Sequence, residues 1–141
     1  MNTQIKQQNT LADHHISIPL KLAALWASFM FFYIYVDYFH LYMPKTLEDI
    51  QSGKVFVFDI TQGFLIAALV SVSIPALMIF LSVVLPSKVN RFSNIIIATI
   101  FIPYTLFNLA GEAWIHMIYG AIVEVLLLLL IIYFAWKWPR N

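Results

Sequence analysis

Two carboxylates lie within apolar stretches of the chain that are long enough to cross a bilayer. Asp37 falls in the run 22–43, and Glu124 falls in the run 113–136. A charged carboxylate at mid-bilayer costs about 2.5–3.5 kcal/mol, so such groups normally face a bundle interior or a water-filled cavity. A carboxyl there can alternate between charged and neutral forms, so these two residues are our candidates for proton-linked binding of a small ligand.

Each carboxylate also has a plain structural interpretation. Glu124 can be protonated and merely hydrogen-bonded to Tyr33 or Asn108. Asp37 stands about two turns from the outer end of its helix, where it can reach headgroup water. The sequence leaves both interpretations open beside the functional one.

Helical spacing brings further polar residues beside the two carboxylates. Tyr33, Asp37 and His40 fall on one face of a helix at i, i+4 and i+7. A second stripe recurs every four residues, and it consists of Glu112, His116, Gly120 and Glu124. The glycine in that stripe would let a neighbouring helix or a ligand approach the backbone closely. We expect Tyr33, His40 and His116 to share the site of the carboxylates.

Two more polar residues stand at helix ends on the same side of the membrane. Gln62 enters the second apolar helix and Asn108 closes the third, so all four helices contribute polar groups to one leaflet. The other half is expected to hold almost no polar groups, apart from four serines that can bond to their own helix: Ser28, Ser71, Ser73 and Ser82. We therefore expect a vestibule that opens outward, with Glu124 near its floor and Asp37 on its wall.

Imidazole and carboxylate ligands together also suit a divalent metal. Asp37 and His40 form an acid and histidine pair at i, i+3, whereas haem ligation would need His40 and His116 opposed across the bundle near its surface. A metal- or haem-binding redox protein stays open as one alternative, although we expect no cofactor. No Ser/His/Asp order, phosphate loop or nucleotide fingerprint is visible, so an enzyme is not the expected function.

The composition requires a membrane to position these residues. Of the 141 residues, 62% are hydrophobic and 11% are charged, against about 25% charged in ordinary soluble domains. The mean hydropathy is +0.84. A net charge of +1 provides no basic field for nucleic acid, and the chain has no cysteine for disulfides, thiolate metal sites or thiol chemistry. The lipid bilayer is therefore the expected surrounding, and nucleic acid is excluded as a partner.

Four apolar stretches predict one all-α integral membrane four-helix bundle, because a chain in lipid must satisfy its backbone groups internally. The polar segment 1–20 precedes a domain over 21–139, with helices at about 21–43, 62–85, 92–111 and 114–138. Pro75 and Pro103 should kink the second and third helices.

Basic residues in the short connections predict the orientation of the bundle. One side carries Lys6, Lys21, Lys88, Arg91, Lys137 and Arg140, whereas the other side carries Lys45 and Lys54. Both termini are therefore expected to be cytoplasmic, in a multi-pass protein of a bacterial inner membrane.

The connection 44–61 is expected on the extracytoplasmic side. Thr46 followed by Asp49 is typical of a capping box, which would open a short helix that Gly53 ends. The apolar segment 55–58 that follows suggests that this connection folds back on the bundle.

Several segments resemble an uncharacterised family of small four-helix bacterial membrane proteins, a domain of unknown function. The resemblance rests on these segments: Tyr33-Ile-Tyr-Val-Asp37, Ile60-Thr-Gln62, Ile74-Pro75, Asn90-Arg-Phe-Ser-Asn-Ile95, Glu124 and Tyr133-Phe-Ala-Trp-Lys-Trp-Pro139. It implies a four-helix inner-membrane protein, and it implies no activity. The short four-helix layout also resembles that of DoxX-like proteins.

The expected function is binding or movement of a small or amphipathic ligand through the polar vestibule. The alternative from another class is a structural or accessory subunit whose polar groups meet a membrane partner. A homo-oligomer also stays open, although no Gly-xxx-Gly spacing marks a dimer face.

Overall fold

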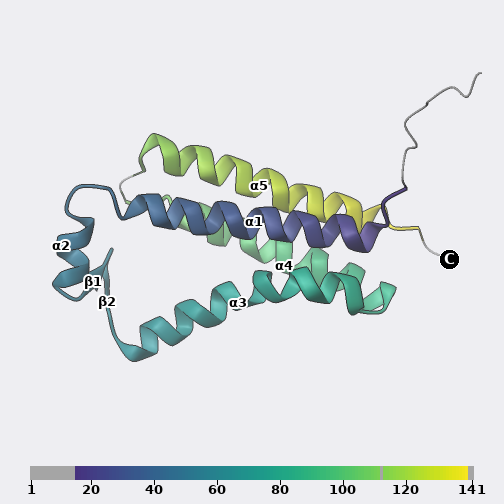
Figure 1. Ribbon diagram of the computed structural model, residues 1–141, viewed down its shortest axis with the longest axis horizontal. Helices are drawn as coiled ribbons and strands as arrows, with labels where there is room; N and C mark the ends of the chain where they lie inside the picture. The colour runs from purple at the N-terminus through teal and green to yellow at the C-terminus, as the bar shows by residue number, and fades with distance from the viewer. Residues whose placement is uncertain (1–14, 112, 140–141) are drawn as a thin grey trace, which may run out of the picture.

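The computed structural model describes residues 15–111 and 113–139, and most of them are helical (Figure 1). The elements in chain order are α1 (Ile18–His40), α2 (Thr46–Gln51), β1 (Lys54–Val55), β2 (Phe58–Asp59), α3 (Gln62–Val84), α4 (Ser87–Phe107) and α5 (Ile115–Trp136). The all-α expectation holds apart from one two-stranded antiparallel hairpin. Of the predicted polar segment 1–20, residues 1–14 lie outside the described part, and α1 already begins at Ile18.

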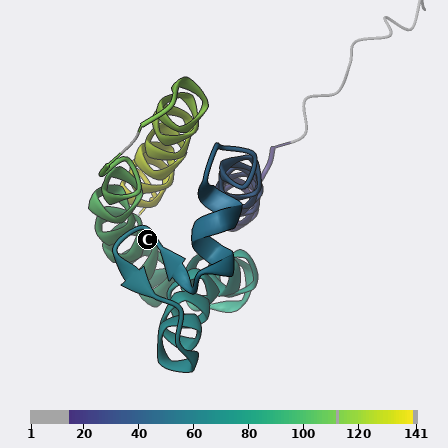
Figure 2. The same cartoon turned by 90° about the vertical axis from the view of Figure 1, so that its left-hand side faces the viewer.

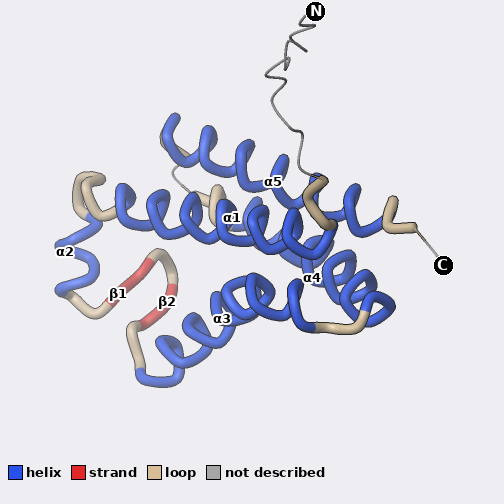
Figure 3. Tube along the Cα trace, turned by 45° about the vertical axis from the view of Figure 1, so that its right-hand side comes forward, coloured by secondary structure: helices blue, strands red, loops and turns tan. Residues whose placement is uncertain are grey.

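The four long helices lie side by side, with α1 packed on α3 and α5 and with α4 packed on α5 and more lightly on α3 (Figures 1 and 2). One end of the molecule holds α2 and the β-hairpin, and we call it the hairpin end. The other holds the start of α1, the α3–α4 turn and the end of α5, and we call it the terminal end (Figure 3). Successive long helices therefore run in opposite directions, as the sequence predicted (Figure 3).

Three helices, α1, α3 and α5, are long and apolar enough to cross a membrane. The helix expected at 92–111 instead spans Ser87–Phe107. Its first two turns are polar, so hydropathy alone placed its start too late. These turns include Asn90 and Asn94, which are fully buried between helices and so belong to the bundle rather than to a loop. Their polarity explains why α4 is absent from the apolar set within the described residues.

The connection after α1 forms more structure than a helix alone. α2 begins at Thr46 and Gly53 follows it with φ +88°, as expected for a glycine stop. The capping box is wrong: Lys45 is the N-cap residue, its φ is +68°, and no side chain caps the helix. The apolar segment that was expected to fold back on the bundle forms the paired strands β1 and β2. The Phe56 ring at the turn between these strands lies against Gly111 in the α4–α5 connection.

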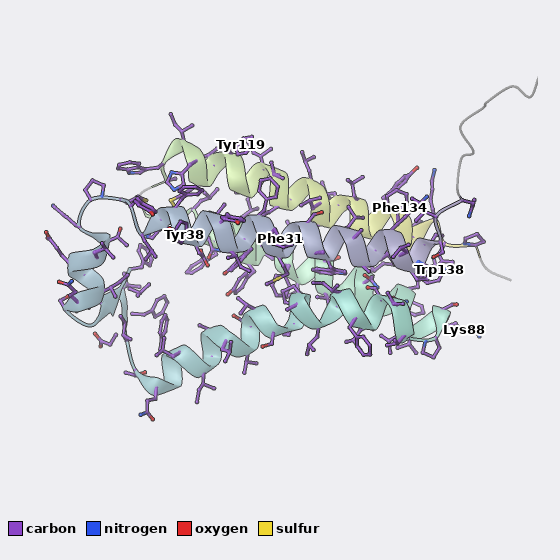
Figure 4. All side chains as sticks on the ribbon, in the orientation of Figure 1. Phe31, Tyr38, Lys88, Tyr119, Phe134 and Trp138 are labelled. Atoms are coloured by element: carbon purple, nitrogen blue, oxygen red, sulfur yellow. The ribbon has the colours of Figure 1, made fainter. Side chains whose placement is uncertain are left out.

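Aromatic and aliphatic side chains fill the space between α1, α4 and α5. Trp26, Phe29, Leu128 and Ile131 are fully buried there. Gly120 of α5 lies so close to Val36 of α1 that a Cβ at residue 120 would overlap a Val36 methyl group, which confirms the expected close approach. Exposed apolar side chains cover the outside, Phe31 of α1 and Tyr119 of α5 among them (Figure 4), as expected for contact with lipid.

α3 differs from the other helices in how little of it packs. Its buried residues are Pro75, Met78 and Ser82, so none lies before the proline. The helix bends near its middle, and its first half diverges from the other helices (Figures 1 and 3). Proline at that position removes a backbone hydrogen bond, which accounts for the predicted kink.

Candidate functional site

A small cavity near the hairpin end brings both carboxylates together. Its polar lining comes from α1, α4 and α5, and it consists of Tyr33, Asp37, Thr105, Asn108 and Glu124. Val36, Leu109, Met117 and Ala121 complete the wall. The free volume is about 10 Å³, which is room for about one water molecule. We call this feature the acidic cavity.

The two carboxylates occupy different positions in the acidic cavity. The Glu124 side chain is 3% exposed, whereas Asp37 is exposed. Gly120 and Ala121 precede Glu124 on α5 and are both buried, and the small glycine permits the contact of α5 with Val36. The short side chains therefore bring α1 and α5 close enough for Asp37 and Glu124 to line one space.

Spacing along the chain did not identify Thr105 as a member of this group. Thr105 is 1% exposed, lines the acidic cavity, and has a buried hydroxyl without a hydrogen-bond partner. It precedes Asn108 by three residues, so the i, i+3 rule on α4 would have placed both on one face. A buried, unpartnered hydroxyl is costly, and it gives a ligand a ready partner.

Tyr104 links the acidic cavity to α3. Its ring stacks on Tyr33 with centroids 6.4 Å apart, and its hydroxyl shares a hydrogen bond of 2.9 Å with Ser71 Oγ. Ser71 also donates to the Ala68 carbonyl, and Ser73 donates to the Leu69 carbonyl, as expected for serines that bond to their own helix. The first half of α3 is thus tied to the cavity wall through one side chain.

Three of the predicted site residues do not line the acidic cavity. Gln62 is exposed at the start of α3. His40 is the last residue of α1 and is not among the residues that line the acidic cavity. His116 lines a separate, wider pocket of about 370 Å³ with four mostly aromatic neighbours, Phe39, Tyr42, Met43 and Trp114. Glu112, the first residue of its stripe, lies outside the described residues.

The arrangement of acids and histidines bears on the metal hypothesis. Within residues 15–111 and 113–139, no three of the His, Asp and Glu residues come together as a set that could hold a metal ion. The Asp37 carboxylate belongs to the acidic cavity, whereas His40 is not among its lining residues. The i, i+3 spacing of these two residues therefore does not produce a shared site.

The terminal half of the molecule contradicts the expectation that it would hold almost no polar groups. A buried hydrogen-bonded group joins three helices there, and we call it the asparagine cluster: Trp26, Ser82, Asn90 and Asn94. Asn94 Oδ1 accepts from the Trp26 indole N–H at 2.7 Å and from Ser82 Oγ at 3.3 Å. Asn94 Nδ2 donates to the Asn90 carbonyl at 2.9 Å and to Asn90 Oδ1 at 2.6 Å.

The asparagine cluster is fully paired at its amides. Asn90 Nδ2 donates to the Ser82 carbonyl at 2.6 Å, so both asparagines use donor and acceptor atoms. Ser82 therefore bonds across helices rather than only to its own helix as expected. Asn90 and Asn94 stand at i, i+4, a spacing that places both on one face of a helix. Arg91 between them is instead typical of a connection at the membrane surface.

A comparison with protein families now identifies the chain. A model described as a family of unknown function, DUF6326, matches residues 13–141. The chain belongs to DUF6326. The match covers both the acidic cavity and the asparagine cluster of this DUF6326 chain. Comparisons with curated proteins and with solved structures found no match.

An aromatic layer separates the two polar regions of this DUF6326 chain. Phe29 and Phe101 meet edge to face with centroids 6.0 Å apart, and both rings contact Trp26. Phe101 then contacts Tyr104 at 5.2 Å, on the side of the acidic cavity. Polar groups therefore stand on both sides of a buried apolar barrier.

Proposed function

We propose that this chain is a multi-pass protein of a bacterial inner membrane that binds, or moves, a small or amphipathic ligand at the acidic cavity with linked proton transfer. Asp37 and Glu124 are the acidic groups, and Tyr33, Thr105 and Asn108 orient the ligand. The carrying observation is that α1 and α5 bring two carboxylates to one cavity inside an apolar bundle, and α4 completes its wall. Intramembrane acids are costly and usually functional.

The topology in this proposal has four crossings with both termini cytoplasmic. α4 is the fourth crossing, since it has 21 residues and lies among the three apolar helices. The basic residues support the orientation, because the terminal end carries more of them than the hairpin end. Lys21, Lys88, Arg91 and Lys137 lie at the terminal end, whereas Lys45 and Lys54 lie at the hairpin end. The acidic cavity then faces the extracytoplasmic half of the bilayer.

A carboxyl reagent tests whether Glu124 exchanges protons in the bilayer. Dicyclohexylcarbodiimide partitions into membranes and couples to protonated carboxyls. In vesicles of purified full chain, we expect mass spectrometry to find the label on Glu124, at a rate that rises as the pH falls. Glu124→Gln should remove this label, whereas the control Glu48→Gln on exposed α2 should keep it.

Two outcomes would overturn this proposal. The first is a Glu124 side chain that stays unlabelled at every pH at which the protein is folded, because such a carboxyl does not exchange protons. Labelling that does not change with pH would also contradict linked proton transfer, because a proton-exchanging carboxyl must change its protonated fraction with pH.

An accessory subunit is the second candidate, and the sparse packing of α3 favours it. The first half of that helix presents exposed apolar residues around its surface, Leu65, Ile66 and Leu69 among them. A partner helix would cover this half, and a stoichiometric complex isolated from membranes should be lost when Ile66→Asp places a charge on this apolar surface. A chain that stays monomeric when isolated under mild conditions would leave lipid as the cover of α3.

A further inference from the structure

We propose that the ligand of the acidic cavity is a primary amine with an apolar chain, whose ammonium group enters the cavity while the chain stays in the bilayer. This inference rests on the proposed function, because it names the ligand class of the same site. It is carried by the charge of the lining, by the size of the cavity and by the unpartnered Thr105 hydroxyl.

The charge of the lining selects a cation. Two carboxyl side chains contribute to the wall, and none of the described lining residues is Lys, Arg or His. A positive group in the cavity would therefore meet carboxylate oxygens without a competing cation from the protein. Carboxylates form hydrogen bonds to ammonium that are about twice as strong as neutral ones.

The size of the cavity selects the kind of cation. A free volume of about 10 Å³ admits one group the size of a water molecule. A primary ammonium group has that size, whereas a trimethylammonium group is several times larger. Three N–H donors also match the oxygen lining, while a quaternary ammonium group has no donor.

Thr105 provides the independent sign that a ligand belongs there. Its side chain is 1% exposed and its hydroxyl has no hydrogen-bond partner in the described protein, although it lines the cavity. An ammonium N–H donated to this oxygen would remove the cost of the unpaired group. The hydroxyl thus gives the ammonium a third oxygen partner beside the two carboxyl groups.

The surroundings of the cavity suit an apolar chain on the amine. Val36, Leu109, Met117 and Ala121 form the apolar part of the wall, and Asp37 is exposed, so the cavity is reached from the bundle surface. The first half of α3 buries no residue. One side-chain hydrogen bond, from Ser71 to Tyr104, connects this half to the side of the cavity. An amphiphile in the bilayer can therefore place its chain beside this half of α3.

Binding of two matched amphiphiles tests this inference. Radiolabelled dodecylamine and dodecyltrimethylammonium share one chain and differ in the head. Both are titrated onto the full chain in nanodiscs of zwitterionic lipid, with empty discs subtracted. We expect dodecylamine to bind at least about tenfold more tightly than the quaternary compound, and Glu124→Gln to remove this preference.

A pair of threonine variants on one helix isolates the cavity. Thr105→Val keeps the side-chain shape and removes the hydroxyl, so we expect it to weaken dodecylamine binding by about tenfold. The matched control is Thr99→Val, because Thr99 is exposed and bonds its own helix at Ile95. It should bind dodecylamine as the unmodified chain does.

The outcomes separate this inference from the proposed function. Equal binding of the two head groups, or equal binding by Thr105→Val and Thr99→Val, overturns the amine assignment. If the pH-dependent carbodiimide label on Glu124 persists and dodecylamine does not protect it, the ligand is of another class and the proposed function stands. If Glu124 is never labelled, both proposals fail.

Discussion

The acidic cavity and the asparagine cluster are both polar regions inside an apolar bundle, but they differ in charge, space and pairing. The cavity has two carboxyls, an unpartnered hydroxyl and room for about one water molecule. The cluster has neutral amides that bond to one another and to Trp26 and Ser82. A fully paired network rigidifies its surroundings, whereas a partly paired group does so less. The terminal half thus has its polar groups paired between helices, and the hairpin half is where we propose that a ligand binds.

The largest effect on stability should come from Asn94→Leu. This change leaves the Trp26 N–H and the Ser82 hydroxyl without their acceptor, so we expect a loss of about 3 kcal/mol in the free energy of unfolding. The measurement is equilibrium unfolding in mixed micelles with sodium dodecyl sulfate. The comparison variant Asn108→Leu changes the exposed C-cap residue of the same helix at the acidic cavity, and it should lose less than about 1 kcal/mol. Equal losses would remove the distinction between the two regions.

Gly120→Ala should destabilise the wall of the acidic cavity by about 2 kcal/mol, because the new Cβ overlaps Val36 and must push α1 from α5. Val36→Ala in the same chain should restore most of this loss. The control is Gly63→Ala at the exposed start of α3, where the added Cβ meets only Thr61 Oγ1 at 3.8 Å. A double variant no more stable than Gly120→Ala would show that the contact with Val36 is not the cause.

Trp26→Phe tests one hydrogen bond of the asparagine cluster while keeping an aromatic ring. We expect a loss of about 1.5 kcal/mol, since Asn94 keeps Ser82 as a donor to its oxygen. Trp136→Phe is the control, because Trp136 is exposed at the end of α5. Similar losses in the two variants would mean that ring size rather than the N–H determines the effect.

The smallest change in stability should follow Glu124→Gln, in contrast to its expected effect on binding. The amide keeps the shape of the side chain and removes a buried acid, so we expect a change within about 1 kcal/mol. The same unfolding measurement checks this value. A loss as large as that of Asn94→Leu would show that Glu124 stabilises the fold. The acidic cavity and the asparagine cluster would then have the same structural role.

Much of the fold was predictable from the chain because lipid imposes simple requirements. Apolar runs of sufficient length predicted α1, α3 and α5, and helical spacing placed Tyr33 and Asp37 on one face. The start of α4 was wrong by five residues, since polar residues at a helix end look the same in a sequence whether water or other helices surround them. The capping box at Thr46 failed for a related reason: the turn at Lys45, rather than a side-chain cap, begins α2.

The candidate site was predictable only in part. Asp37 and Glu124 stood out because charge is rare in hydrocarbon, and Asn108 and Tyr33 join them in the cavity. Thr105 gave no such signal, because a threonine can satisfy itself on its own helix and commonly does so in membranes. Gln62 was expected with the others, but the bend of α3 separates its start from the helices that form the cavity.

The sequence by itself determined that this chain is a membrane protein made of long helices, with two acids inside apolar stretches, because composition and periodicity are properties of single segments. Only the tertiary structure decided which polar groups pair and which stay free. The close contact at Gly120 brings Asp37 beside Glu124, and the crossing of α1, α3 and α4 brings Trp26, Ser82 and Asn94 into one network. Pairing depends on distances between helices, which no single helix specifies.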